Sequence, residues 1–252
     1  MGIKGNNAVL GEAAKKYAGH PLSLMLLGGY LQTVYQGDIQ QLGMVNLLFD
    51  EEGWSDHARK LMEAYLSWFN GKPESDILSM ICLIDRSTTL DKLKLLTSLD
   101  NDFGISGELN KLSHSQWCYA IKRLCDAKLM AVQLIGEKQV IECHPLVKEF
   151  IARRPKELSH RKWIEGNKLL FRYYQNSVSE DPENIEELDN LFRAVLHGTQ
   201  AAMHQEAFHL YFFRIKNGFT MPSKGSHYAD ENCIRSFFEN PWSVPVRDLS
   251  EE

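Results

Sequence analysis

His144 is the residue whose type and setting best suit binding chemistry. It follows two short runs rich in β-branched residues and stands directly before Pro145. An imidazole N–H is a good hydrogen-bond donor to a phosphate oxygen, so His144 is a candidate phosphate contact. The alternative interpretation is an ordinary surface histidine at a strand–helix junction.

Other residues that could perform chemistry lack a supporting local pattern. His204 and His209 are five positions apart, so they do not stack on one helix face as ligands at i, i+4 do. The acidic run at 50–52 is interpreted as solvated charge before a turn. No Gly-x-x-x-x-Gly-Lys-[Ser/Thr] loop and no apolar strand ending in Asp-Asp is present, although an ATP-binding core needs them. We therefore expect no catalytic residues, no metal and no enzymatic activity of this chain alone.

The bulk composition is that of a folded protein with two or three domains. The chain has 252 residues, of which 44% are hydrophobic and 24% are charged. A net charge of -5 argues against a dedicated nucleic-acid binder. No apolar run approaches the length of a membrane span, and the N-terminus lacks a signal peptide's apolar core. Five cysteines without a Cys-x-x-Cys pair favour buried thiols in a reducing cytoplasm.

Helical periodicity dominates the chain and must position these residues. One β signal stands out: Leu129–Ile135 and Gln139–Cys143, separated by three residues, predict a hairpin. Helices followed by one hairpin are the layout of a winged helix. Aromatic-rich helices after Lys156 would pair as a TPR-like solenoid does, although no clean 34-residue repeat is found. Helices are expected over residues 8–18, 22–35, 39–49, 55–70, 76–84, 89–96, 107–112, 115–127, 145–154, 158–178, 185–200 and 205–217.

Three segments resemble motifs of NB-ARC and related STAND signalling ATPases. Gly-His-Pro-Leu-Ser-Leu at 19–24 resembles the family's Gly-x-Pro-Leu-Ala-Leu motif, with Ser23 in place of the usual Ala. Cys-His-Pro-Leu-Val-Lys-Glu-Phe at 143–150 resembles the Met-His-Asp segment and the His-Pro-Leu-Val-Arg-Glu form of bacterial members. Residues 191–215 resemble the start of TPR arrays in bacterial STAND proteins. The three segments stand in the family's order.

The resemblance implies roles for two residues. In the family, the motif's proline packs near the adenine, and the corresponding residue here is Pro21. The family's histidine reaches the β-phosphate of bound ADP and holds the protein closed, which implies that role for His144. Cys143 and Pro145 replace the Met and Asp of the segment, so any role of that Asp does not transfer. For Pro21, the alternative is an ordinary helix start, where its missing N–H has no helical partner.

We therefore expect a mainly α fold with three parts: a helical domain of NB-ARC type at 1–52, a winged helix at 53–155 and TPR-like repeats at 156–252. The chain would be the regulatory fragment or split product of a cytoplasmic STAND NTPase. ADP or ATP would bind only together with a missing P-loop domain, in cis or in trans. The helical repeats would bind a protein partner or ligand, and no membrane contact is expected.

Two alternatives remain open. In the first, the winged helix makes the chain a DNA-binding transcription regulator, although its helix 115–127 offers only Lys122, Arg123 and the following Lys128, balanced by Asp126. In the second, the chain is a plain TPR-like protein-binding scaffold. The basic run at 153–156 could contact an anion or an acidic domain, or be a solvated linker.

Overall fold

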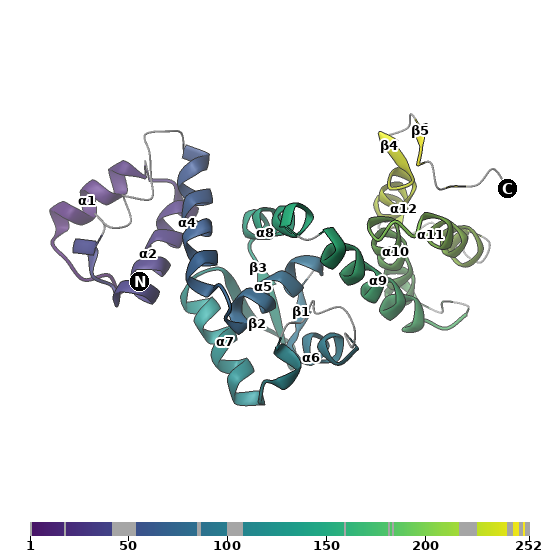
Figure 1. The fold of residues 1–252 in the computed structure, drawn as a ribbon, viewed down its shortest axis with the longest axis horizontal. Coiled ribbons are helices and arrows are strands. Elements are labelled where there is room, and N and C mark those ends of the chain that lie inside the picture. The colour runs from purple at the N-terminus through teal and green to yellow at the C-terminus, as the bar shows by residue number, and fades with distance from the viewer. Residues whose placement is uncertain are drawn as a thin grey trace. The chain divides into compact units, whose positions relative to one another are not determined.

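The computed structural model describes residues 2–17, 19–41, 54–84, 87–99, 108–158, 160–180, 182, 184–216, 226–240, 244–246 and 249. These residues form a mainly α-helical fold with eleven α-helices and two small antiparallel sheets (Figure 1). The chain divides into two compact units. The first is Met1–Ser98 with Ser106–Pro155, and the second is Leu99–Ile105 with Lys156–Glu252. None of the helices in these ranges is long and apolar enough to cross a membrane.

The first unit is built from helices around one small sheet. Proline occupies the first turn of α2 and α5, where its missing N–H has no helical partner. Its elements in chain order are α1 (Asn7–Lys16), α2 (Pro21–Tyr35), η1 (Ile39–Gln41), α4 (Trp54–Phe69), α5 (Pro73–Leu83), β1 (Thr88–Thr89), α6 (Leu90–Leu99), η2 (Leu109–Lys111), α7 (His114–Asp126), β2 (Met130–Ile135) and β3 (Lys138–Cys143), and α8 (Pro145–Leu158) follows.

The sheet of the first unit has the strand order β1–β3–β2, and both pairings are antiparallel. In the hairpin, Ile135 pairs with Lys138, so the loop is Gly136 and Glu137. Gly136 has a φ of 61°, whereas Glu137 is not among the residues with positive φ. A positive φ at the first loop residue alone is the signature of a type II′ turn, whose twist matches that of the strands.

Tyr65 of α4 fixes α2 against the end of α7. Its side chain is fully buried, and its hydroxyl lies 2.7 Å from the carbonyl of Ala127 and 3.1 Å from that of Leu26. A Cβ on Gly29 of α2 would come within 2.5 Å of the same Ala127 oxygen. Glycine is therefore what allows α2 to approach the C-terminal end of α7 this closely.

The second unit contains α9 (His160–Asn176), α10 (Ile185–Gln200), α11 (His204–Leu210), a π-helix η3 (Tyr211–Lys216), α12 (Ser226–Arg235) and the two short strands β4 (Phe238–Asn240) and β5 (Val244–Pro245). Helices α9, α10 and α11 pack around Gly198, where an added Cβ would lie 2.8 Å from Ala207 and 2.9 Å from the ring of Phe171.

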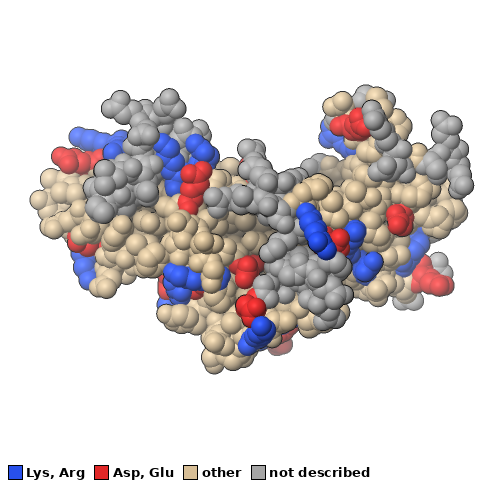
Figure 2. Space-filling view, viewed as in Figure 1, with Lys and Arg blue, Asp and Glu red and all other residues tan. Residues whose placement is uncertain are grey.

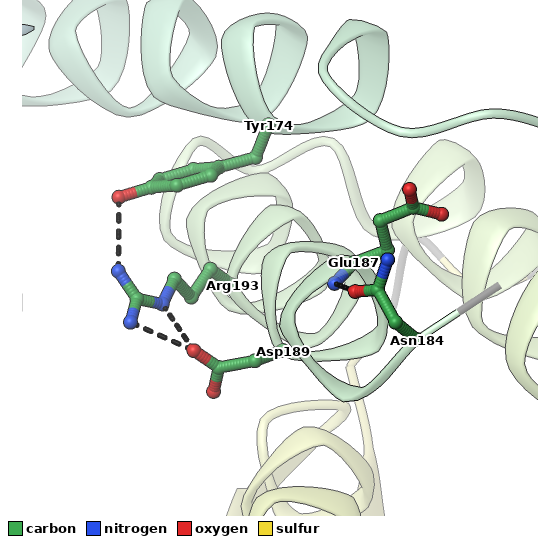
Figure 3. A network of polar contacts seen from close by, with 5 residues as sticks. All are labelled: Tyr174, Asn184, Glu187, Asp189 and Arg193. Carbon is green, nitrogen blue, oxygen red and sulfur yellow. Dashed lines mark hydrogen bonds and ion pairs between the residues drawn. The ribbon is translucent and has the colours of Figure 1, made fainter. Parts of the chain in front are cut away.

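Polar contacts tie α10 to α9 (Figure 3). Asn184 caps α10, because its Oδ1 accepts a hydrogen bond of 2.9 Å from the backbone N–H of Glu187. Arg193 binds Asp189 one turn earlier at 2.7 Å and donates to the Tyr174 hydroxyl of α9 at 3.4 Å. The network therefore joins one capped helix to its neighbour through a single guanidinium.

The mainly α fold and the β-hairpin agree with the sequence prediction, but several details differ. The hairpin loop has two residues instead of three. Four elements were not predicted: β1, β4, β5 and α12. The helix expected at 107–112 has a 3-10 turn at Leu109–Lys111, and that expected at 39–49 has one at Ile39–Gln41. Residues 42–49 and 107 lie outside the described residues.

No solenoid is identified in the described part of the second unit. The first compact unit ends at Pro155. Apart from Leu99–Ile105, residues 1–52 and 53–155 belong to this one unit, and their separation into two domains stays a prediction.

Candidate functional site

His144 stands between β3 and α8 and serves as a side-chain cap for α8. Its Nδ1 accepts a hydrogen bond of 3.2 Å from the backbone N–H of Leu146. An accepting Nδ1 carries no proton, so the neutral imidazole holds its proton on Nε2. The side chain is exposed. His144 therefore presents an N–H donor outward while its other nitrogen holds the ring in place.

Pro21 lies in the same local setting at the start of α2. His20 caps that helix, because its Nδ1 accepts from the backbone N–H of Ser23 at 3.4 Å and lies 3.3 Å from the Ser23 hydroxyl. Pro21 is exposed and occupies the first turn, as a helix-starting proline should. The sequence His-Pro-Leu thus occurs twice in the chain, each time with the histidine capping a helix.

A cleft of about 540 Å³, termed here the His144 cleft, lies beside the capping histidine. Its lining includes His144, Met130 of β2, and Met25 of α2. Met25 lies one helical turn after Pro21, but Pro21 itself does not line the cleft. Lys128 and Glu142 give the lining one basic and one acidic side chain. The structure therefore brings His144 and α2 to one cleft, with α2 represented by Met25.

A second cleft of about 470 Å³ lies between α2 and the C-terminal end of α7. Gly28, Gly29 and Thr33 line its α2 side, and Lys128 lines both clefts. The buried hydroxyl of Thr33 has no hydrogen-bond partner within the described part of the chain. Lys128 has a φ of 62°, a left-handed conformation that is uncommon for a residue with a side chain. This backbone turn leads α7 directly into β2.

The basic residues of α7 are engaged within the protein. Arg123 forms an ion pair of 2.6 Å with Glu74, a carboxylate that is 2% exposed. Lys122 pairs with Asp126 at 2.6 Å, and this hydrogen bond raises the pKa of Lys122. On the face drawn in Figure 2, the described acidic and basic side chains lie interspersed. Of these two cations, Lys122 is exposed but lies beside Asp126, and Arg123 is directed to a buried carboxylate. This is little basic surface for a DNA-reading helix.

Two other histidines, His197 and His209, occupy different environments. His197 is 4% exposed and its Nδ1 lies 2.9 Å from the side-chain oxygen of Asn167. His209 lies against the ring of Phe213, with centroids 4.2 Å apart. Across the described ranges, no three His, Cys, Asp or Glu side chains are grouped as metal ligands. The acidic run at 50–52 and the side chains of the basic run at 153–156 lie outside the described part.

The cysteines are not all buried, contrary to expectation. Cys143 and Cys233 are buried, Cys82 and Cys125 are half-buried, and Cys118 is exposed. Burial raises the pKa of Cys125 and Cys233. A hydrogen bond between Cys82 and Cys143 raises the pKa of Cys82 and lowers that of Cys143. The Cys143 thiol also donates to the carbonyl of Leu129 at 3.1 Å.

One group of polar side chains in contact was not predicted from the sequence. The Sγ of Cys118 lies 3.5 Å from Nε2 of His114, and Nδ1 of His114 lies 2.8 Å from Nζ of Lys94. The i, i+4 spacing of His114 and Cys118 could have revealed the first contact, because such residues share a helix face. Lys94 comes from another helix, and no sequence signal connects it to them.

Comparison with known proteins yields no match to a family model, to a curated protein or to a solved structure. The resemblance to STAND proteins therefore stays a prediction from the three sequence motifs.

Proposed function

We propose that this chain is the regulatory portion of a STAND-type NTPase switch, contributing nucleotide-state sensing and partner binding instead of catalysis. The observation that carries the proposal is the capping of α8 by His144. Its Nδ1 accepts from Leu146, which leaves Nε2–H as an outward donor at the rim of a cleft that α2 also lines. A fixed donor of this kind suits a phosphate oxygen.

The proposed mechanism is a two-state switch. Nε2–H of His144 would donate to a phosphate oxygen of ADP held by a separate P-loop domain, and the start of α2 would lie towards the adenine. The phosphate of bound nucleotide would contact His144 in the closed state and not in the open state. Because a ligand shifts an equilibrium only through different contacts in the two states, the loss of this hydrogen bond would favour the open state.

The fold supports the proposal at a coarse level. Helices α5, α6 and α7 precede the β2–β3 hairpin, and β1 pairs with β3 at the sheet edge. That order is typical of a winged helix. In the second unit, α9 and α10 form a tightly packed helix pair like those that begin TPR-like repeats. Exposed aromatic side chains there suit a protein partner: Phe208, Phe212 and Phe213.

The test is a titration of the full chain with ADP, followed by NMR of the histidine imidazoles. Tight binding would require the separate P-loop domain, so for this chain alone we expect saturation only at about 10 mM ADP. The His144 signal should shift with ADP. The variant His144→Asn keeps the helix cap, because asparagine also accepts from the backbone. It replaces the imidazole Nε2–H by amide N–H groups on a shorter side chain, which do not reach the same position, and should weaken binding at least about threefold.

The matched control is His20→Asn, which alters the other His-Pro-Leu cap and should leave ADP binding unchanged. Adenosine and pyrophosphate separate the two halves of the ligand, and pyrophosphate alone should still shift His144. If ADP leaves the His144 signal unmoved at this concentration, or if both asparagine variants bind ADP equally, the sensing role is wrong.

The DNA-binding alternative has a direct test of its own. Because Arg123 is held by the buried Glu74 and the exposed Lys122 lies beside Asp126, we expect no salt-dependent binding of duplex DNA beyond weak non-specific contact. Affinity that falls steeply with salt would favour the transcription-regulator reading instead.

A further inference from the structure

We propose that Cys118, His114 and Lys94 form a reactive thiol site that exchanges with small-molecule disulfides of the glutathione class. This inference is independent of the proposed nucleotide sensing, because none of its three residues lines the His144 cleft. The site is a linear relay: Nζ of Lys94 lies 2.8 Å from Nδ1 of His114, and Nε2 of His114 lies 3.5 Å from Sγ of Cys118.

The directions of the two hydrogen bonds follow from the donors available. A lysine ammonium has donors only, so Nδ1 of His114 must accept from Lys94. The neutral imidazole then carries its proton on Nε2, which faces the Cys118 sulfur. The sulfur is therefore the acceptor of this hydrogen bond, and the ammonium charge lies behind the imidazole. Both contacts would stabilise the negative charge that the sulfur carries when it attacks a disulfide.

The relay is held by a well-anchored helix start. Ser113 and Gln116 form a reciprocal capping box, with contacts of 2.8 and 3.3 Å. His114 and Cys118 follow one turn apart, so they share one face of α7. Trp117, between them in sequence, is 2% exposed and anchors the same turn in the core. The thiol thus sits on a fixed surface, open to solvent.

The other thiols provide an internal contrast. Cys118 is the one exposed cysteine of the five, all of which the structure describes. Burial of Cys143 and Cys233 denies access to a reagent, and raised pKa values disfavour the thiolates of Cys82 and Cys125. A reagent that needs both access and a thiolate should therefore select Cys118.

The reaction is thiol–disulfide exchange and needs no further oxidant. The Cys118 thiolate attacks one sulfur of oxidised glutathione, and its own proton goes to solvent. A new S–S bond forms to one glutathionyl group while the old S–S bond breaks. The second glutathione leaves as a thiolate and takes up a proton. Cys118 is oxidised and one glutathione is reduced, so atoms and electrons balance.

The experiment follows modification of the full chain by oxidised glutathione at neutral pH, with the modified cysteine located by peptide mass spectrometry. We expect Cys118 to react about tenfold faster than any other cysteine. Lys94→Met and His114→Gln should each slow it roughly threefold to tenfold, whereas Lys111→Met, a nearby exposed lysine paired with Glu108, should not.

The pH profile separates activation from mere exposure. The slowing in Lys94→Met and His114→Gln should disappear above pH about 9, where ordinary thiols ionise unaided. The inference is overturned if another cysteine reacts first, or if both variants react as fast as the unmodified chain at neutral pH.

Discussion

Replacing Tyr65 by phenylalanine should remove one buried hydroxyl from the junction of α2, α4 and α7. The side chain is fully buried, and its hydroxyl lies 2.7 Å from the carbonyl of Ala127 and 3.1 Å from that of Leu26. Leu26 lies within α2, where its carbonyl has a helical partner. Ala127 is the C-cap of α7, so its carbonyl depends on the hydroxyl.

The expected loss of stability follows from the difference between the two carbonyls, because only that of Ala127 would be left without a donor. A buried acceptor left without a donor costs about 1–3 kcal/mol, so Tyr65→Phe should lower the free energy of unfolding of the first unit by about 2 kcal/mol. For a unit of this size the change corresponds to a fall in Tm of roughly 4–8 °C. The ring and its packing remain, so no cavity contributes.

Hydrogen exchange followed by mass spectrometry is the suitable assay, because it reports the first unit separately from the second. Thermal unfolding by circular dichroism complements it. The matched control is Tyr119→Phe on α7, whose side chain is 65% exposed and whose loss of a hydroxyl should change stability by less than about 0.5 kcal/mol. Equal effects of the two substitutions would refute the reasoning.

Three further predictions concern stability. Gly29→Ala should lower the free energy of unfolding by about 2 kcal/mol, because its Cβ would lie 2.5 Å from a carbonyl oxygen. The added Cβ of Gly11→Ala meets open space, so this control should raise the free energy of unfolding by about 0.5–1 kcal/mol. Thermal unfolding measures both. Glu74→Gln should lower the free energy of unfolding in urea by about 3 kcal/mol, because it breaks the ion pair of a buried carboxylate with Arg123. Asp126→Asn, which breaks the exposed pair with Lys122, should lower it by less than about 1 kcal/mol. Similar values for the two variants would contradict this prediction. Burial raises the pKa of Tyr17, Tyr65 and Tyr211 above the unfolded value of about 10. The free energy of unfolding should therefore be constant below that pH and fall above it, by about 1.4 kcal/mol per pH unit for each tyrosine. A urea midpoint that stays flat up to pH about 11 would count against this prediction.

The sequence predicted those elements that carry a long periodic signal. Most helices fell close to their expected ranges because apolar residues recur at helical spacing, and the hairpin was evident from two β-branched runs around Gly136. The short strand β1 could not be predicted. It consists of only Thr88 and Thr89, which are extended because they pair with β3, a strand distant in the chain.

The candidate site was predictable only in part. The junction before Pro145 marked His144, but the bond from Leu146 that fixes its proton on Nε2 is visible only in three dimensions. The cleft that joins His144 to Met25 depends on how α2 meets the hairpin, which no local pattern encodes. Likewise, Lys94 of α6 contacts His114 of α7, and no sequence pattern links the two helices.

We propose that this chain senses nucleotide without a phosphate-binding core of its own. Isothermal titration of the full chain with Mg-ADP and Mg-ATP, together with an assay of ATP turnover, tests it most directly. We expect dissociation constants of about 1 mM or weaker and no turnover. Micromolar binding or measurable hydrolysis would contradict it.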